Sequence, residues 1–169
     1  AMSRGSAMSV GEIIGAGVLA RIDGELVSTP DAQPHHFDFG DGQVLCAPLS
    51  FGDLVTSWHT TRIPNIAMFV HICADAFPEG DLSLLPDGPS EQEREAHRAR
   101  AVAEVTSVDG VVARSMIETV NGYTFTSLAA IEAARRVLRG ERQTGFATPV
   151  SVFGIEFASS IAGTIITDW

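Results

Sequence analysis

The stretch Val120-Asn-Gly-Tyr-Thr-Phe-Thr-Ser-Leu-Ala-Ala-Ile-Glu-Ala-Ala-Arg-Arg-Val-Leu-Arg-Gly140 carries the clearest structural signal in the sequence. Asn121-Gly122 is a turn dipeptide because both residues tolerate positive φ, and the hydroxyls of Thr124 and Thr126 can cap the start of a helix. Gly140 can end that helix in a left-handed conformation. Between these ends an apolar stripe recurs at helical spacing and predicts the core-facing side: Leu128, Ile131, Ala134 and Leu138.

Upstream of this helix the sequence alternates extended segments with turns. Three hairpins are predicted, over residues 12–30 around Asp23-Gly24, residues 35–48 around Gly40-Asp-Gly42, and residues 101–120 around Asp109-Gly110. The nearly continuous apolar run Ile66–Cys73 predicts a strand buried on both faces. Residues 52–58 are expected to form a short helix or an irregular turn.

The remaining segments are shorter. Prolines and glycines over residues 77–89 predict a loop, and Ser90-Glu-Gln-Glu93 is typical of a capping box ahead of a solvated helix over residues 91–100. Residues 150–153 are expected to be extended, and residues 162–169 to form a last strand. Many hairpins with few helices predict the α+β class: a mixed, largely antiparallel sheet with helices packed on one face.

Length and composition set further expectations. The 169 residues are 45% hydrophobic and 19% charged, which predicts a single domain over residues 10–169. Residues 1–9 lack the apolar core of a signal peptide, and we interpret them as a vector remnant outside the fold. A formal net charge of −10 argues against nucleic-acid and anionic-membrane partners. No apolar run has the length of a membrane span, so a cytoplasmic location is expected.

Cysteines and histidines offer little metal chemistry. Cys46 and Cys73 lie in apolar, strand-like surroundings without a zinc-ligand spacing, so we expect both to be buried free thiols. We expect His71 to be a hydrogen-bonded core residue and His97 to be solvated. The pair His35-His36 could bind a metal only with partners that the sequence does not locate.

The common catalytic motifs are also missing. Gly15-Ala-Gly17-Val-Leu-Ala20 fits G-x-G-x-x-A, but a hairpin follows it where a dinucleotide site needs a helix. The chain contains no lysine, which excludes a Walker motif, and no G-x-S-x-G nucleophile elbow. No spacing brings two carboxylates together.

The most informative polar segment is Ser57-Trp-His-Thr-Thr-Arg62. His59 lies beside two hydroxyls and a guanidinium, a combination that can form the wall of a site for a carboxylate substrate. The alternative is a loop histidine whose ring is satisfied by the neighbouring backbone.

Several motifs, in order along the chain, resemble the saccharopine dehydrogenase-like family of bacterial oxidoreductases. They are Arg21-Ile-Asp-Gly-Glu-Leu-Val27, Thr61-Arg-Ile-Pro-Asn-Ile66, Gly88-Pro-Ser-Glu91, Asn121-Gly-Tyr-Thr-Phe-Thr-Ser-Leu128, Gly145-Phe-Ala-Thr-Pro149, Val152-Phe-Gly154 and Ile165-Ile-Thr-Asp-Trp169. The resemblance spans about residue 11 to the end. Two departures stand out: members carry an N-terminal Rossmann domain that precedes these motifs, and residues 72–88 are short compared with relatives.

The resemblance implies a substrate-side and dimerisation-type domain of an NAD(P)-dependent oxidoreductase. On this interpretation the chain alone binds no cofactor and is inactive, because NAD(P) belongs to the missing Rossmann domain. The substrate is expected to be a small amino- or oxo-acid-like molecule. The residues expected to face it are His59, Thr61, Arg62, Asn65, Tyr123 and Thr124. Arg62 would hold a carboxylate, while the hydroxyls and Asn65 would orient the rest.

Two alternatives stay open. The chain could be a non-catalytic homodimerising α+β module, with Ile66–Cys73 and the Ile/Thr-rich C-terminus forming the interface. It could also be an unrelated small α+β enzyme.

Overall fold

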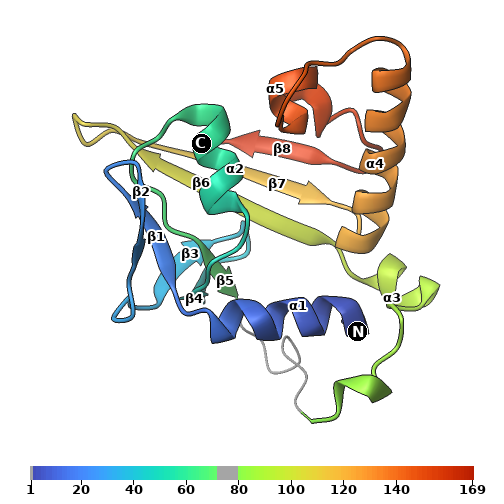
Figure 1. Ribbon diagram of the computed structural model, residues 1–169, viewed down its shortest axis with the longest axis horizontal. Helices are drawn as coiled ribbons and strands as arrows, with labels where there is room; N and C mark the ends of the chain where they lie inside the picture. Colours follow the sequence, from blue (N-terminus) through green and yellow to red (C-terminus); the bar gives the residue numbers. More distant parts are fainter. Residues whose placement is uncertain (1, 72–79) are drawn as a thin grey trace. The chain divides into compact units, whose positions relative to one another are not determined.

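The computed structural model describes residues 2–71 and 80–169 (Figure 1). Contacts between residues divide the chain into two compact units, whereas the sequence predicts one domain over residues 10–169. Unit 1 comprises Ala1–Asp38 and Gly42–Ser90, and unit 2 comprises Phe39–Asp41 and Glu91–Trp169. Within the described residues the strands form three antiparallel sheets, so the predicted α+β class is confirmed, with three sheets in place of one.

The first sheet of unit 1 is the predicted hairpin at Asp23-Gly24. Strands β1 (Leu19–Ile22) and β2 (Glu25–Ser28) pair in antiparallel register, with Ile22 opposite Glu25. Asp23 and Gly24 both have positive φ, at 50° and 86°. A two-residue turn with this geometry matches the twist of the strands it joins, and Asp-Gly supplies it with little strain.

The second sheet of unit 1 has the order β3-β4-β5. Strands β3 (His35–Asp38) and β4 (Gln43–Pro48) form the predicted hairpin, and β5 (Phe69–His71) pairs with the other edge of β4. The prediction for Ile66–Cys73 needs correction. Of this run, only Phe69–His71 form a strand within the described residues. Phe69 and Val70 are half-buried, so the strand is not buried on both faces, and His71 is exposed rather than in the core. Residues 72 and 73 lie outside the described residues, as do 77–79 of the predicted loop.

The first element of the described residues is a helix that the sequence did not predict. Helix α1 (Arg4–Gly15) starts at Ser3, whose hydroxyl accepts the backbone N–H of Ser6 at 3.1 Å. The backbone N–H of Arg4 donates to Pro86 O at 2.9 Å, beside the short 3-10 helix η1 (Leu82–Leu84). Because Ala7 is buried, setting residues 1–9 aside from the fold was wrong; their vector origin stays a prediction. The predicted start of a strand at residue 12 is likewise helical.

Unit 2 is built on a sheet with the order β6-β7-β8. Strands β6 (Ala99–Thr106) and β7 (Val112–Thr119) form the third predicted hairpin, and β8 (Ile165–Asp168) adds the predicted C-terminal strand. Helix α3 (Glu91–Ala96) is shorter than the charged helix predicted over residues 91–100, because strand β6 already begins at Ala99. His97 is exposed, as predicted.

An ion network fixes one end of this sheet. The carboxylate of Glu118 accepts hydrogen bonds from Nε of Arg100 at 2.6 Å and from Nε of Arg98 at 2.7 Å. These bonds hold the pKa of Glu118 below its usual range. Arg100 also pairs with Asp41, which ties the loop residues 39–41 to β6.

The helix predicted between Asn121 and Gly140 is present as α4 (Gly122–Leu138). Its cap differs from the prediction: the side-chain oxygen of Asn121 accepts the backbone N–H of Tyr123 at 3.1 Å, while the hydroxyl of Thr126 donates back to Gly122 O. Gly140 ends the helix with φ of 102°, as predicted. The backbone N–H of Glu141 reaches Arg136 O and that of Gly140 reaches Val137 O, which is a Schellman motif.

The predicted core-facing side of α4 is wrong. Ile131 is 61% exposed and Leu138 is 87% exposed, and Leu128 is also exposed. The half-buried side contains Phe125, Ala129 and Arg136 instead. Arg136 decides this orientation, because its guanidinium lies 5.7 Å from the ring centre of Phe153 and 5.2 Å from that of Phe157.

The aromatic partners of Arg136 come from two short helices. Helix α5 (Pro149–Phe153) replaces the predicted extended piece at residues 150–153, and η2 (Ile155–Phe157) follows it. The backbone N–H of Ser151 donates to the hydroxyl of Thr148, and the backbone N–H of Thr148 donates to the hydroxyl of Ser151. These reciprocal bonds form a capping box at the start of α5, whose first residue is Pro149. The Thr-Pro pair was therefore a helix-start signal.

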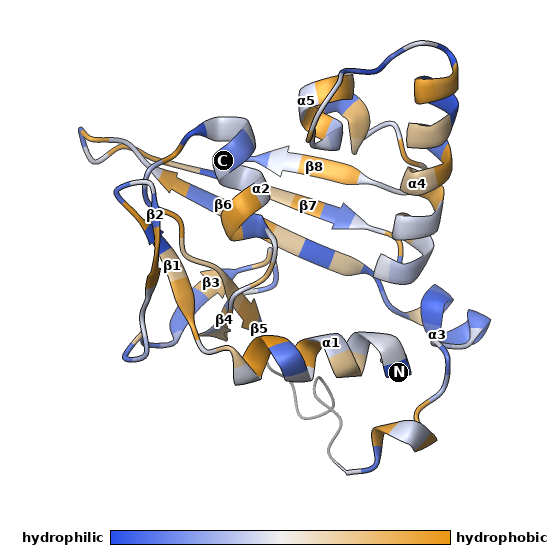
Figure 2. Ribbon diagram, in the orientation of Figure 1, coloured by the Kyte–Doolittle hydropathy of each residue, from blue (hydrophilic) through white to orange (hydrophobic). Residues whose placement is uncertain are grey.

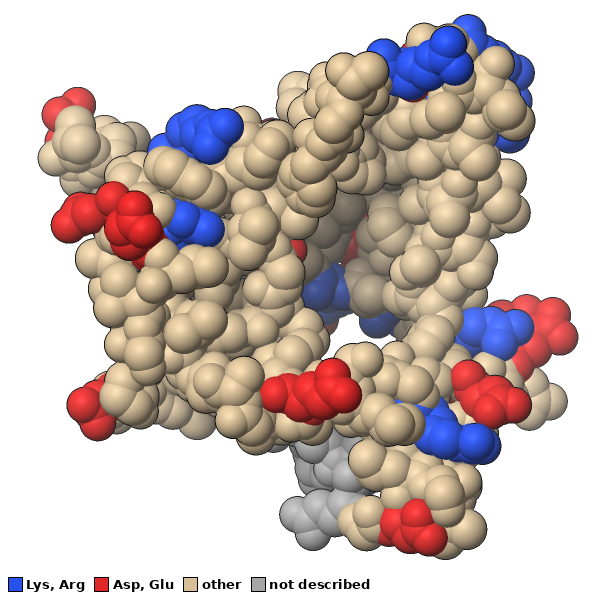
Figure 3. Space-filling model, in the orientation of Figure 1, with Lys and Arg blue, Asp and Glu red and all other residues tan. Residues whose placement is uncertain are grey.

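Each unit buries few apolar side chains. Among the described residues, those that count as core are Ala7, Val10, Cys46, Leu49 and Leu54 in unit 1, and Phe157 and Ile161 in unit 2. Figure 2 shows apolar residues along α4 and β8, both largely exposed. On the face shown in Figure 3, charged side chains are scattered between larger uncharged areas. Since apolar side chains are normally buried against another layer, the exposed apolar residues of α4 and β8 form surfaces that another molecule can contact.

Gly163, in the loop before β8, lies close to Val120, and substitution of this glycine tests how closely the loop packs. Gly163 has φ of 79°, and a Cβ placed there would lie 2.7 Å from Cγ1 of Val120. Gly163→Ala should lower the free energy of unfolding by about 2–5 kcal/mol, combining left-handed strain with overpacking. Urea denaturation measures the loss.

The matched control is Gly145→Ala. Gly145 has φ of 85°, and beyond its two chain neighbours nothing lies within 4 Å of the added Cβ, so only the strain of about 1–2 kcal/mol should appear. Val120→Ala should cost less in the Gly163→Ala background than in the unaltered chain, because it removes the clash. Equal losses for the two glycines would contradict the close approach of Val120.

Candidate functional site

The predicted site segment forms helix α2 (Asp53–Thr61) of unit 1. The helix is anchored by Leu54, one of the most completely buried side chains of the described residues. It ends at Arg62, which adopts a left-handed conformation with φ of 59° and donates its backbone N–H to Trp58 O at 3.0 Å. This ending turns the chain sharply toward Pro64.

Trp58 is the centre of the cluster at the end of α2. The guanidinium carbon of Arg21 lies 5.0 Å from the centre of its ring, and that of Arg62 lies 5.5 Å away. A Cβ added to Gly24 would lie 3.2 Å from Cη2 of Trp58, so the indole covers the β1–β2 turn closely. One aromatic ring thus contacts two cations and a backbone turn.

The two arginines differ in environment. Arg21 is buried, with 7% of its surface exposed. Its Nε donates to Leu54 O at 2.9 Å, and a terminal guanidinium nitrogen donates to Gly24 O. In the part of the chain that the structure describes, Arg21 forms no ion pair, so carbonyl dipoles and the indole face stabilise its charge. Arg62, by contrast, is exposed.

Backbone contacts join this cluster to the chain beyond Pro64. Arg21 and Ile66 exchange backbone hydrogen bonds at 2.8 and 2.9 Å. The side-chain oxygen of Asn65 accepts the backbone N–H of Asp23 at 3.0 Å. The amide oxygen of Asn65 therefore already supports the β1–β2 turn.

Thr61 is also engaged locally. Its hydroxyl donates to Ser57 O at 2.8 Å and accepts the backbone N–H of Ile63 at 3.2 Å. His59 lies on α2 next to Trp58 and is half-buried. Of the four predicted site residues in unit 1, Arg62 is therefore the one whose exposed charge is best placed to meet a ligand.

The other two predicted site residues belong to unit 2. Tyr123 and Thr124 lie in the first turn of α4, where the cap formed by Asn121 holds the backbone of Tyr123. The six predicted residues are therefore divided, with His59, Thr61, Arg62 and Asn65 in unit 1 and Tyr123 and Thr124 in unit 2. Their shared role in binding substrate stays a prediction.

Sequence reasoning missed Trp58 and Arg21 as members of the cluster. The spacing of Trp58 and Arg62 was a usable signal, since residues four apart meet on one side of a helix. Arg21 offered no such signal, because its contact with Trp58 depends on how the β1–β2 hairpin meets α2.

Other candidate chemistry receives little support. No group of three or more His, Cys, Asp or Glu residues is arranged to hold a metal within the described residues. The ring of His35 packs instead against Phe37 and Phe69, at 4.9 and 6.1 Å between centres. Cys46 is a buried free thiol, as predicted, and burial raises its pKa, whereas Cys73 lies outside the described residues.

The glycine motif at Gly15-Ala-Gly17 has the wrong order for a dinucleotide site. Helix α1 ends at Gly15 and strand β1 follows, whereas the pyrophosphate site needs a strand followed by the start of a helix. The sequence-based argument against this motif agrees with the observed order of elements.

Comparison with models of known protein families, with curated proteins and with solved structures finds no match. None of the helices in the described ranges combines the length and apolar character needed to cross a bilayer. The interpretation of the site therefore depends on its own geometry and on the sequence motifs.

The two arginines on Trp58 should respond very differently to the same change. Arg21→Met should lower the free energy of unfolding by about 2–4 kcal/mol, because the carbonyls of Leu54 and Gly24 lose a charged donor. Arg62→Met should cost only about 0.5–1 kcal/mol, the contribution of an exposed cation–π contact. Urea denaturation of the two variants gives the comparison, and similar losses would contradict the assignment of Arg21 as the structural arginine.

Proposed function

We propose that this chain is the substrate-side domain of a saccharopine dehydrogenase-like NAD(P)-dependent oxidoreductase, in which Arg62 binds a substrate carboxylate. The observation that carries the proposal is the pair of guanidinium groups on the ring of Trp58. In a chain of net charge −10, this pairing makes a local positive site beside one aromatic face. The substrate class is an amino or oxo acid.

The geometry gives the two arginines separate tasks. Arg21 is buried and bonded to carbonyl groups, so it holds Trp58 and contributes positive potential from a fixed position. Arg62 is exposed and keeps guanidinium N–H groups available for a bidentate contact with a carboxylate. Stacking on Trp58 limits its side-chain freedom, which lowers the entropy lost when a ligand binds.

The motifs behind the family resemblance support the same grouping. Arg21-Ile-Asp-Gly24 and Thr61-Arg-Ile-Pro-Asn-Ile66 lie far apart in the sequence, yet the Arg21–Ile66 bridge and the Asp23–Asn65 hydrogen bond join them. Two segments that form one structural element have a physical reason to occur together. NAD(P), bound by a Rossmann domain outside this chain, would supply the hydride chemistry, and the residues around Arg62 would bind and orient the acid.

Tryptophan fluorescence tests this role directly, because the chain has only two tryptophans. In a Trp169→Phe background the signal reports Trp58. Titration with 2-oxoglutarate should give a saturable change, whereas its uncharged dimethyl ester should give none. Arg62→Ala should weaken binding about tenfold, since it removes a charged hydrogen-bond donor.

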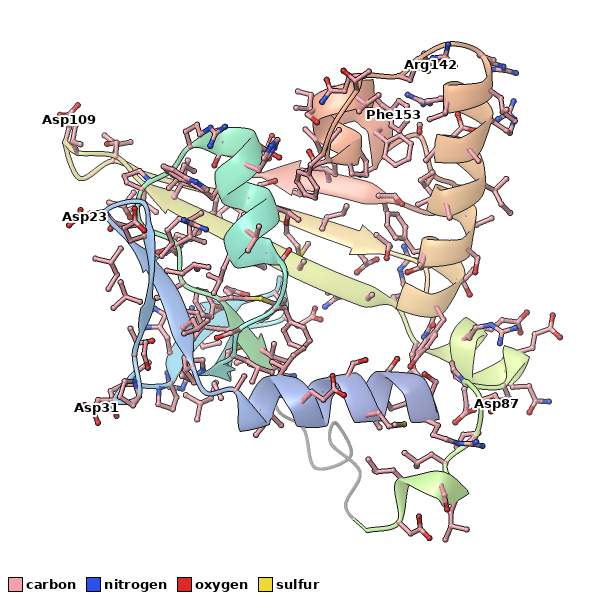
Figure 4. All side chains as sticks on the ribbon, in the orientation of Figure 1. Asp23, Asp31, Asp87, Asp109, Arg142 and Phe153 are labelled. Carbon is pink, nitrogen blue, oxygen red and sulfur yellow. The ribbon has the colours of Figure 1, made fainter. Side chains whose placement is uncertain are left out.

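The matched control is Arg142→Ala, which removes an exposed arginine of unit 2 (Figure 4). It should leave the titration unchanged, and Arg62→Lys should retain part of the affinity. Equal binding by the Arg62→Ala and unaltered chains would overturn the assignment. Adding NAD(P)H to the chain should produce no saturable change; micromolar binding would overturn the idea of a separate cofactor domain.

A second candidate function is a homodimerising module, and β8 favours it. Within the described residues this strand pairs with β7 alone, so its other edge has no partner strand there. Ile165 is 59% exposed and Ile166 is 42% exposed, so both faces of the strand also present apolar side chains. An open apolar edge can pair with the same strand of a second copy.

Light scattering at increasing concentration tests the second candidate. If β8 forms the interface, the chain should be a dimer, and Ile166→Pro should give a monomer because proline removes a backbone donor from the strand. Val108→Pro, in the exposed turn between β6 and β7, is the control and should leave the dimer intact. A monomeric unaltered chain would contradict this function without affecting the proposed carboxylate site.

A further inference from the structure

Unit 1 contains a hollow at the open end of the β1–β2 hairpin, away from the turn that Trp58 covers. Its volume is about 500 Å³. The walls include Leu19 and Ala20 from β1, Pro48 from the end of β4, Ala67 and Met68 just before β5, and Phe69 at its start. A volume of this size lies within the range of about 300–1,000 Å³ found for small-molecule sites.

Hydrogen bonds hold the two walls of the hollow together. The hydroxyl of Ser50, just after β4, accepts the backbone N–H of Leu19 at 2.6 Å and donates to Leu19 O at 3.3 Å. The backbone N–H of Leu49 donates to Met68 O at 3.1 Å. The backbone of β1 is therefore fixed to the segments around β4 and β5, and the hollow is preformed before any ligand binds.

The lining has the chemistry of an apolar binding site. Aliphatic, proline and aromatic side chains make up most of it, and Met68 adds a flexible, polarisable side chain that adapts to the shape of a ligand. Water in such a space gains few hydrogen bonds, so an apolar group replaces it favourably.

Polar groups gather at one part of the hollow, where Ser28 ends β2 and Thr29 and Asp31 follow it. The hydroxyl and the backbone N–H of Thr29 both donate to Val18 O, at 3.4 and 2.8 Å. Asp31, labelled in Figure 4, is exposed and forms no ion pair within the described residues. In a chain of net charge −10, a carboxylate at this position favours a cation and disfavours an anion.

We propose that this hollow binds a small apolar molecule that carries an amine, with the apolar body against Met68 and Phe69 and the ammonium group near Asp31. The site differs in chemistry from the carboxylate site proposed at Arg62, and the two lie toward opposite ends of the β1–β2 hairpin. It is therefore a second ligand site of unit 1.

Three probes with one apolar body test the proposal: 2-naphthylmethylamine, 2-naphthylmethanol and 2-naphthoate. The readout is the methyl NMR signal of ¹³C-labelled methionine, of which the chain has four. The amine should shift the Met68 signal in a saturable way through the ring current of the naphthalene. Met116, in β7 of unit 2, should not shift. The alcohol should bind about two- to fivefold more weakly than the amine, the range for an exposed ion pair, and the anion should bind most weakly.

Two substitutions sharpen the test. Asp31→Asn should make the amine and the alcohol bind equally, while the Met68 shift persists. Ala67→Phe should weaken all probes about tenfold or more by filling the hollow, and the control Ala130→Phe on α4 should not. Should Ala67→Phe fail to fold, Ala32→Leu fills the same space. The proposal is overturned if no probe shifts Met68, if all methionines shift together, or if the anion binds as tightly as the amine.

Discussion

The contact of the buried Arg21 guanidinium with Trp58 is the interaction on which unit 1 depends most. A cation removed from water is costly, and here hydrogen bonds to Leu54 O and Gly24 O and the face of the indole offset that cost. Leu54 and Trp58 belong to α2 and Gly24 to the β1–β2 turn, while Arg21 itself belongs to β1. One side chain thereby fixes the hairpin to the helix, and the Arg21–Ile66 bridge extends this connection to the chain ahead of β5.

Unit 2 uses the same solution with different residues. Arg136 bonds to Glu132 and to the hydroxyl of Ser160 while its guanidinium lies over Phe153 and Phe157. The hydrogen bond from Arg136 to Glu132 is the main reason that the pKa of Glu132 lies below its usual range. All eleven basic residues other than histidine are arginine. A planar guanidinium can stack on a ring and donate in its own plane at once, which the compact ammonium of lysine cannot do.

These arginine–aromatic contacts also bear on function. Because the buried Arg21 holds Trp58 in place, the exposed side chain of Arg62 stacks on an indole whose position is fixed. The backbone of Arg62 ends α2, whereas its guanidinium is not needed to hold the fold. Asn65 and Thr61 differ from Arg62, because their side chains already form hydrogen bonds within the fold. Asn65 supports the β1–β2 turn, and Thr61 supports the end of α2. The two groups that we propose for ligand binding in unit 1, Arg62 and Asp31, are therefore exposed side chains that form no ion pair within the described residues. The exposed residues of β8 and α4 add surfaces that a partner can cover.

Local chemistry made the hairpins at Asp23-Gly24 and Asp109-Gly110 and the end of α4 at Gly140 predictable. Turn dihedrals and helix ends depend on a few neighbouring residues, so the sequence by itself determined the α+β class and most element positions. It also placed Arg62 in a candidate site. The sequence did not reveal which side of α4 faces inward, because the apolar spacing of Leu128, Ile131 and Leu138 competes with the contacts of Arg136. The contact of Trp58 with Arg21, the role of Asn65 and the hollow at Met68 were likewise decided only by the tertiary structure. Each requires residues tens of positions apart to meet, and such meetings depend on packing rather than on local preference.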